Sequence, residues 1–164
     1  MTSTVSMTAT PTLEVAMLDA ACARPGARVL DVGCGRGDVT LDAARRVGPS
    51  GLVLGVDTRL AMLEDARHRA AQAGLGYVGF VHGDTQTQRF LPLRFDVIVS
   101  ARGLGVFTDV DAGIANLTGA LRAGGRLALL APDDPAEARA ALDRAGLVGS
   151  VAGATGVVTA SAAL

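Results

Sequence analysis

The stretch Arg28-Val29-Leu30-Asp31-Val32-Gly33-Cys34-Gly35-Arg36-Gly37-Asp38 decides the fold of this chain. It begins as a short apolar run that predicts a β-strand, and it ends where a helix is expected to start, at residue 38 or 39. The turn between them carries glycine at positions 33, 35 and 37. Glycine has no Cβ and adopts positive φ readily, so such a turn can lie flat against a ligand. A strand, a glycine-rich turn and a helix N-terminus together are typical of a site for a nucleotide-like molecule.

Strands and helices are predicted to alternate on both sides of this stretch. Helices are expected over 13–23, 39–47, 59–73 (with Thr58 as its cap), 110–121 and 135–146. Strands are expected over 28–32, 52–57, 77–82, 95–100 and 126–131, followed by two short strands near 147–151 and 156–160. The central strands are apolar throughout, which is typical of a parallel sheet covered on both faces. These patterns predict an α/β fold, a three-layer doubly wound domain around a mostly parallel seven-stranded sheet.

The length and composition set limits on the kind of protein. The 164 residues suit a single domain, which we expect to span 13–164 after a flexible tail over 1–12 that is rich in Ser and Thr. The 15 basic and 16 acidic residues nearly balance, which argues against a nucleic-acid partner. Cys22 and Cys34 form no metal-ligand pattern, so no metal is expected. No apolar run approaches the roughly 20 residues of a membrane helix and no secretory signal is evident, so we expect a cytoplasmic protein without membrane contact.

Four of the predicted strands end in groups suited to ligand binding. In an open α/β sheet, the ligand lies beyond the carboxyl ends of the strands, where the strand order reverses. The first strand brings Asp31 and the glycine turn, the second Asp57, the third Asp84 and the fourth Ser100-Ala101. A carboxylate at the position of Asp57 is placed to accept hydrogen bonds from both ribose hydroxyls. These groups predict a nucleoside with a charged tail, and both NAD and S-adenosylmethionine fit this outline.

The spacing of the glycines distinguishes between binding sites for these two cofactors. It reads Gly33-x-Gly35-x-Gly37, whereas the NAD fingerprint is Gly-x-Gly-x-x-Gly. Over about residues 13–164, the chain resembles the class I S-adenosylmethionine-dependent methyltransferases of the small-molecule type. The resembling motifs are Asp-Val-Gly-Cys-Gly-Arg-Gly (31–37), Gly-Val-Asp (55–57), His-Gly-Asp-Thr (82–85), Phe-Asp-Val-Ile-Val-Ser (95–100) and Leu-Arg-Ala-Gly-Gly-Arg-Leu (121–127). The last motif departs from the family pattern at Ala123, where proline is usual.

The resemblance implies roles for the residues of the first two motifs. Asp31 would brace the glycine turn by accepting its backbone N–H groups. The backbone from Gly33 to Gly37, which includes Cys34 and Gly35, would pass under the methionine moiety of the cofactor. Asp57 would hold the ribose, and Thr58 and Met62 would line the adenine face.

The later motifs complete the implied cofactor site. After Gly83, the carboxylate of Asp84 would accept the adenine amino proton, and the N–H of Thr85 would face a ring nitrogen. Ser100 and Ala101, at the end of the fourth strand, would meet the methionine ammonium group. Arg102 is a candidate for contact with the substrate or with the methionine carboxylate.

The activity implied by the resemblance is S-adenosylmethionine-dependent methyl transfer to a small-molecule acceptor, mainly by positioning of the acceptor. No catalytic base is assigned, because a base is needed only where the acceptor must lose a proton. The short distance from the fifth strand to the helix at Pro135 leaves no room for a lid insertion. Three explanations remain open: a bulky acceptor that forms its own cover, a homo-oligomer or partner that supplies the lid, or a subunit that binds cofactor without transferring methyl groups. A non-methylating reaction such as cyclisation is a further alternative.

Overall fold

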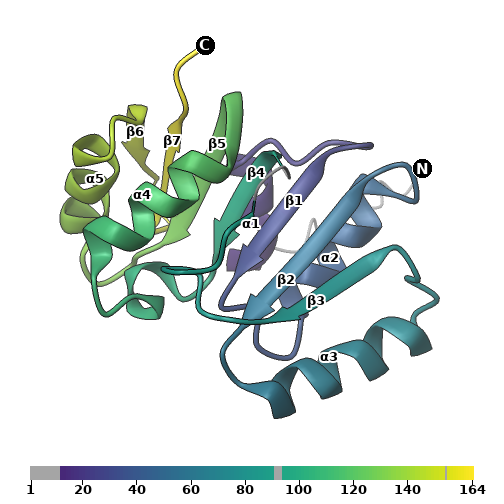
Figure 1. The fold of residues 1–164 in the computed structure, drawn as a ribbon. Helices are drawn as coiled ribbons and strands as arrows, with labels where there is room; N and C mark the ends of the chain where they lie inside the picture. Colours follow the sequence, from purple (N-terminus) through teal and green to yellow (C-terminus); the bar gives the residue numbers. More distant parts are fainter. Residues whose placement is uncertain (1–11, 91–93, 154) are drawn as a thin grey trace, which may run out of the picture.

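The computed structural model describes residues 12–90, 94–153 and 155–164. Within these residues the chain forms one seven-stranded sheet with the strand order β3-β2-β1-β4-β5-β7-β6 (Figure 1). The strands are β1 (Arg28–Val32), β2 (Leu52–Asp57), β3 (Val78–His82), β4 (Phe95–Ser100), β5 (Leu121–Leu130), β6 (Val148–Ala152) and β7 (Val157–Ser161). Strands β1 to β5 pair in parallel, and β7 runs antiparallel to β5 and to β6. The predicted mostly parallel sheet is confirmed.

The order of the strands reverses between β1 and β4. From β1 the chain adds β2 and β3 on one side, and it then crosses over to add β4 and β5 on the other. Strand β4 pairs with β1 so that Val97 lies opposite Val29 and Val99 lies opposite Asp31. The carboxyl ends of β1 and β4 therefore flank the crevice in which open α/β sheets bind their ligands.

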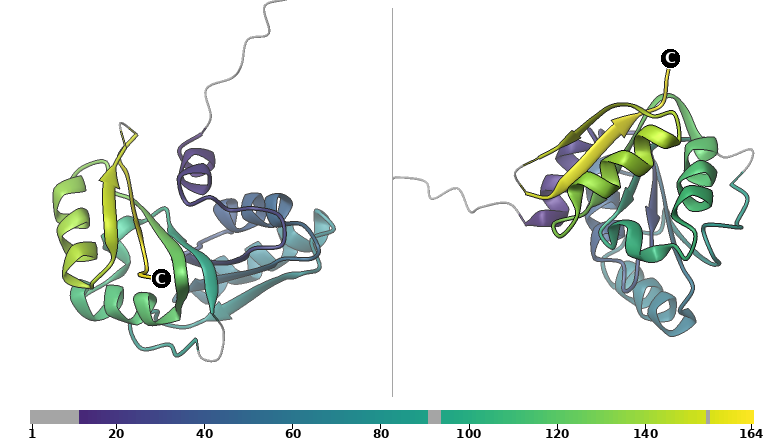
Figure 2. Two further views of the ribbon diagram at one scale, coloured as in Figure 1. Left: turned by 90° about the horizontal axis from the view of Figure 1, so that it is seen from above. Right: turned by 90° about the vertical axis from the view of Figure 1, so that its left-hand side faces the viewer.

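Helices cover both faces of the sheet and complete three layers (Figure 2). The helices of the described part are α1 (Leu13–Ala20), α2 (Asp38–Val47), α3 (Leu60–Gln72), the short 3-10 helix η1 (Gly103–Val106), α4 (Val110–Ala120) and α5 (Pro135–Arg144). Fully buried Met17 and Val47 pack α1 and α2 into one apolar core, and Ile114 and Leu142 pack α4 and α5 into the other. Burial of each such side chain stabilises the fold by roughly 1.5–3 kcal/mol, so packing on the two faces holds the helices against the sheet.

Two helix starts show why these segments become helical. The Asp134 carboxylate accepts a hydrogen bond from the Glu137 N–H at 2.9 Å, and Pro135 occupies the first turn of α5. In the same way, Asp109 accepts a hydrogen bond from the Ala112 N–H at 3.0 Å and caps α4. Both caps satisfy backbone donors that a helix N-terminus leaves without an internal partner.

The structure corrects several of the expected boundaries, among them the end of α1, which lies at Ala20 and not at residue 23. Two further corrections concern the starts of α3 and β5. Helix α3 begins at Leu60 and is preceded by Arg59, so Thr58 is not its cap. The Asp57 carboxylate accepts the Arg59 N–H at 2.9 Å, and residue 59 keeps extended backbone angles. Strand β5 begins at Leu121, before the expected residue 126, because Leu121 already pairs with the first residue of β4 ahead of a register shift.

The N-terminal tail predicted over 1–12 lies outside the described residues except for Thr12. The Thr12 hydroxyl accepts a hydrogen bond from the Val15 N–H at 3.3 Å and caps α1. The single domain predicted over 13–164 stays a prediction. In the part of the chain that the structure describes, no helix combines the length and the apolar character needed to cross a bilayer.

Candidate functional site

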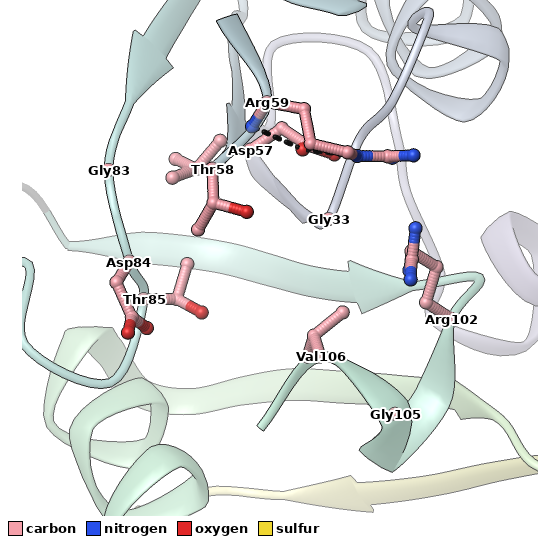
Figure 3. A pocket seen from close by; sticks show the side chains of 11 residues that line it. Gly33, Asp57, Thr58, Arg59, Gly83, Asp84, Thr85, Arg102, Gly105 and Val106 are labelled. Carbon is pink, nitrogen blue, oxygen red and sulfur yellow. Dashed lines mark hydrogen bonds and ion pairs between the residues drawn. The ribbon is translucent and has the colours of Figure 1, made fainter. Parts of the chain in front are cut away.

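A pocket of about 170 Å³ opens where the carboxyl ends of β1, β2 and β3 meet the loop that follows β4 (Figure 3). It is lined by Gly33, Val56, Asp57, Thr58, Arg59, Gly83, Asp84, Thr85, Arg102, Gly105 and Val106. Seven of these residues were predicted from the sequence: Gly33, Asp57, Thr58, Gly83, Asp84, Thr85 and Arg102. The fold thus brings three separate sequence motifs and the β4 loop to one place.

The glycine-rich turn is held by the end of β2. The N–H groups of Gly33 and Cys34 both donate to the Val56 carbonyl, at 2.8 and 3.0 Å, and the Gly35 N–H donates to the Asp57 carboxylate at 2.8 Å. Gly33 has a φ of 70°, and a Cβ at this position would lie 2.6 Å from the Val106 side chain. Glycine is favoured there, because a larger residue would be strained by the positive φ and would require the Val106 side chain of η1 to shift.

Asp57 is buried and accepts four hydrogen bonds. Besides the Gly35 N–H, it accepts the Arg59 N–H at 2.9 Å, the Arg59 Nε at 3.0 Å and the Arg59 Nη2 at 3.1 Å. Burial acts to raise the pKa of Asp57, but these hydrogen bonds and the Arg59 charge outweigh it and hold the pKa below its usual range. The carboxylate is therefore ionised at neutral pH and aimed at the pocket.

Asp31 lies beneath the glycine-rich turn and is only 1% exposed. One of its carboxylate oxygens accepts a hydrogen bond from the Thr40 hydroxyl of α2 at 2.6 Å. Burial raises its pKa to about 7, although the hydrogen bond from Thr40 opposes this shift. The structure thus corrects the predicted role of Asp31, because the N–H groups of the turn donate to Val56 and Asp57 instead.

Three other predicted residues face the protein interior or the neighbouring helix. Cys34 is buried against β2, where a Cβ on Gly55 would lie 2.9 Å from its sulfur. Burial raises the pKa of the Cys34 thiol, so it stays protonated. Gly37 precedes α2 with a φ of 85° and packs near Ala66 of α3. Met62 is half-buried on α3 and does not line the pocket.

The loop after β3 is tied to the loop before α4 by the side chain of Gln86. Its Nε2 donates to both carboxylate oxygens of Asp84, at 3.2 and 3.1 Å. Its Oε1 accepts hydrogen bonds from the N–H groups of Thr108 and Asp109, at 3.1 and 2.7 Å. Gln86 therefore fixes the orientation of Asp84 from outside the pocket, and it belongs to the residues that the sequence did not reveal.

A second cavity lies beside the first, at the carboxyl end of β5. It measures about 400 Å³ and is lined by Ala101, Arg102, Leu104, Gly105, Leu130, Ala131, Pro132, Asp133 and Asp134. Arg102 and Gly105 line both cavities. Ser100 is fully buried at the end of β4, and its hydroxyl donates to the Gly103 carbonyl at 3.4 Å. Of the two residues predicted here, Ala101 thus faces the second cavity and Ser100 supports the turn.

Sequence reasoning missed four residues of the first pocket: Val56, Arg59, Gly105 and Val106. Arg59 carried a signal, since a cation two residues after a ligand-binding carboxylate is placed to pair with it. The other three contribute backbone or apolar surface, for which a single sequence offers no pattern. In the described residues no group of three or more His, Cys, Asp or Glu side chains is arranged to hold a metal ion.

The comparisons with known proteins agree with this geometry. A family model described as "Methyltransferase domain" matches residues 29–125. Nocamycin O-methyltransferase of Saccharothrix syringae is 40% identical over 123 residues, which are 75% of this chain and 44% of that protein. The ubiquinone/menaquinone biosynthesis C-methyltransferase of Shewanella halifaxensis is 37% identical over 114 residues, which are 69% of this chain and 45% of that protein.

The solved structure of TrmN from Thermus thermophilus has the same fold, with a TM-score of 0.76 and 29% sequence identity. The match covers 92% of this chain and 48% of that one. The chain thus spans less than half the length of each of these three relatives. The matched residues 29–125 are more than half of the chain and include the glycine turn, Asp57 and Asp84. The chain therefore belongs to the methyltransferase domain family, with the Rossmann-like fold of the class I S-adenosylmethionine-dependent methyltransferases.

Proposed function

We propose that this domain binds S-adenosylmethionine in the pocket at Asp57 and transfers its methyl group to a small-molecule acceptor. The observation that carries the proposal is the convergence of Gly33, Asp57 and Asp84 on one pocket at the reversal of the strand order. Membership of the methyltransferase domain family supports S-adenosylmethionine as the cofactor for this pocket.

The polar groups of the pocket fit the adenosine half of the cofactor. Asp57 is an ionised acceptor at the end of β2, and the two ribose hydroxyls are donors that suit it. Asp84 is an acceptor at the end of β3 and suits the adenine amino group. Thr58 and Thr85 line the space between them, and Gly83 brings the backbone close.

The methionine half would lie along the glycine turn towards Arg102. Gly33 exposes backbone to the pocket, and the Gly35 N–H donates to Asp57. The Gly37 N–H donates to the Cys34 carbonyl within the turn, while Asp31 is bonded to Thr40 beneath it. At the end of β4, Ser100 orients the turn on which Ala101 and Arg102 lie.

The cavity beside Arg102 is the proposed acceptor site. Leu104, Leu130 and Pro132 give it an apolar wall, and it meets the cofactor pocket at Arg102 and Gly105. Bound S-adenosylmethionine supplies an electrophilic methyl group, so the protein has to align the acceptor atom and exclude water. The exposed guanidinium of Arg102 suits an acceptor that carries an anionic group, such as a carboxylate or a phenolate.

Calorimetry with S-adenosylhomocysteine tests the cofactor assignment. We expect Asp57→Ala to weaken binding by about 10- to 100-fold, because charge-assisted hydrogen bonds contribute about 1.5–3 kcal/mol. Asp111→Ala is the control, since this carboxylate pairs with Arg144 at 2.9 Å and does not line the pocket. Equal affinities of the wild type and Asp57→Ala would refute the assignment of Asp57 to the ribose. Absence of binding by the wild type would refute the proposed function.

The product then tests the reaction and the need for a partner. Incubation with a panel of phenolic and carboxylic acceptors is expected to yield products heavier by one methylene unit. A product of unchanged mass would indicate a cyclisation instead. Turnover by the purified chain alone would count against the need for a different partner protein, and turnover only after addition of such a partner would favour it. The cytoplasmic location stays a prediction.

A further inference from the structure

The guanidinium of Arg59 is hydrogen-bonded to the Asp57 carboxylate, and both residues line the pocket (Figure 3). Its Nε donates to Oδ1 of Asp57 at 3.0 Å, and its Nη2 donates to Oδ2 at 3.1 Å. The backbone N–H groups of Arg59 and Gly35 add one further bond to each oxygen, at 2.9 and 2.8 Å. A carboxylate offers about four acceptor positions, so Asp57 is saturated by these four donors.

The four donors differ in how easily they can leave. The Gly35 N–H belongs to the glycine turn and the Arg59 N–H to the start of α3, so both are fixed by the fold. The other two belong to one guanidinium, whose side chain is 47% exposed, whereas the Asp57 side chain is 3% exposed. The half-exposed guanidinium of Arg59 stays solvated when it turns away, whereas the buried Asp57 carboxylate would lose two of its four donors. The cost of the exchange is therefore small only where new donors take the place of the guanidinium on Asp57.

The bonds that Arg59 makes have the pattern that a ribose would need. The guanidinium places one N–H on each oxygen of Asp57, and a vicinal diol likewise presents two O–H donors, one for each oxygen. We infer that Arg59 is an affinity-determining residue that holds Asp57 until the ribose diol of the cofactor displaces its guanidinium. This inference rests on the proposed function, in which Asp57 binds the ribose.

The size of the pocket supports this exchange. Its volume of about 170 Å³ lies below the roughly 300–1,000 Å³ of sites for ligands of this size. Arg59 and Asp57 both line it, so the departure of the guanidinium both frees the two acceptor positions and enlarges the space. A ligand that uses both oxygens of Asp57 therefore has to break this ion pair, and the cost lowers its affinity.

Calorimetry on the wild type, Arg59→Ser and Arg59→Lys tests this inference with three probes. We expect Arg59→Ser to bind S-adenosylhomocysteine and adenosine about two- to fivefold more tightly than the wild type. Arg59→Lys cannot donate to both carboxylate oxygens in a bidentate manner, so its affinity is expected to lie between those of the wild type and Arg59→Ser. Binding of 2′,3′-dideoxyadenosine should not change, because this probe has no diol to displace the guanidinium. Adenosine is uncharged, so a gain for it does not come from removal of charge repulsion.

The matched control is Arg144→Ser. Arg144 is also 47% exposed and also pairs with carboxylates, those of Asp111 and Glu137, but it lies on α5 and does not line the pocket. This variant is expected to bind every probe as the wild type does. Thermal unfolding of each ligand-free variant checks that the fold is intact.

The results separate this inference from the cofactor assignment. If Asp57→Ala weakens binding while Arg59→Ser binds with unchanged or lower affinity, the role of Arg59 is overturned and the ribose assignment stands. A gain in Arg59→Ser that extends equally to 2′,3′-dideoxyadenosine also overturns it. If Asp57→Ala binds as the wild type does, the ribose assignment fails and the role of Arg59 fails with it.

Discussion

Replacement of Asp31 by Asn is expected to remove a large pH dependence of stability. Burial raises the pKa of Asp31 from 3.8 to about 7 in the folded protein. Between these two values the folded state retains a proton that the unfolded state has released, so the free energy of unfolding falls as the pH rises. The contribution is fully present below about pH 4 and is lost as the pH passes through about 7. Asn carries no such proton and gives no such change.

The magnitude follows from the size of the shift. Each pKa unit corresponds to about 1.4 kcal/mol, and about two units lie between pH 5 and the folded-state pKa. The wild type should therefore lose about 2–3 kcal/mol of stability from this group between pH 5 and pH 8. Because Asp31 is only 1% exposed, solvent screening does not reduce this value greatly.

Urea unfolding at pH 5, 6, 7 and 8 measures the effect. The difference in unfolding free energy between the wild type and Asp31→Asn should change by the stated amount over this range. Thr40→Val is the companion variant, because loss of the 2.6 Å hydrogen bond removes a contact that lowers the pKa of Asp31. In that variant the decline should move to higher pH. Parallel pH profiles for the wild type and Asp31→Asn would refute the reasoning.

Two further substitutions probe the loops around the pocket. Gly33→Ala should destabilise the fold by about 1–2 kcal/mol, the cost of a left-handed Cβ, and more if the Val106 side chain cannot move away from the new methyl group 2.6 Å from it. Gly76→Ala, with no atom within 4 Å of the new Cβ, is its control in urea unfolding. Gln86→Ala should lower the unfolding free energy by about 1–3 kcal/mol and weaken binding of S-adenosylhomocysteine, since it frees two loops. Gln72 is exposed, so Gln72→Ala should change neither the unfolding free energy nor the affinity. Equal effects of the two glutamine variants would contradict the role of Gln86 in joining the two loops.

Much of the fold could be predicted because the chain's local signals agree with its tertiary structure. The apolar runs that end at Asp57 and Ser100 form β2 and β4 with the expected boundaries. The helix start at Asp134 follows from local capping chemistry, and the structure shows the bond. Several boundaries were wrong, for different reasons. The start of β5 is decided by its pairing with β4, and Thr58 is not a cap because the adjacent Asp57 carboxylate accepts the Arg59 N–H.

The candidate site likewise contains residues that the sequence predicts and contacts that it does not. Asp57 and Asp84 could be placed because each follows an apolar strand, and the topology brings strand ends together. The bonds of Arg59 to Asp57 depend on a side-chain rotamer, and those of Gln86 depend on the approach of two loops. The partner of Asp31 depends on the packing of α2 over the turn. No spacing in the sequence encodes such contacts.

The close approach of η1 to the end of β5 has a consequence for the evolution of this domain. A Cβ on Gly103 would lie 2.3 Å from the Leu130 carbonyl oxygen, and one on Gly156 would lie 2.7 Å from Pro132. The Ala131 N–H also donates to the Gly156 carbonyl at 2.8 Å. The rim of the proposed acceptor cavity is thus braced by the segment that leads into β7, far along the chain from the glycine turn, Asp57 and Asp84. Under the proposed function, mutations in the hairpin of β6 and β7 would offer a route to new acceptor preferences that leaves the proposed adenosine-binding half intact.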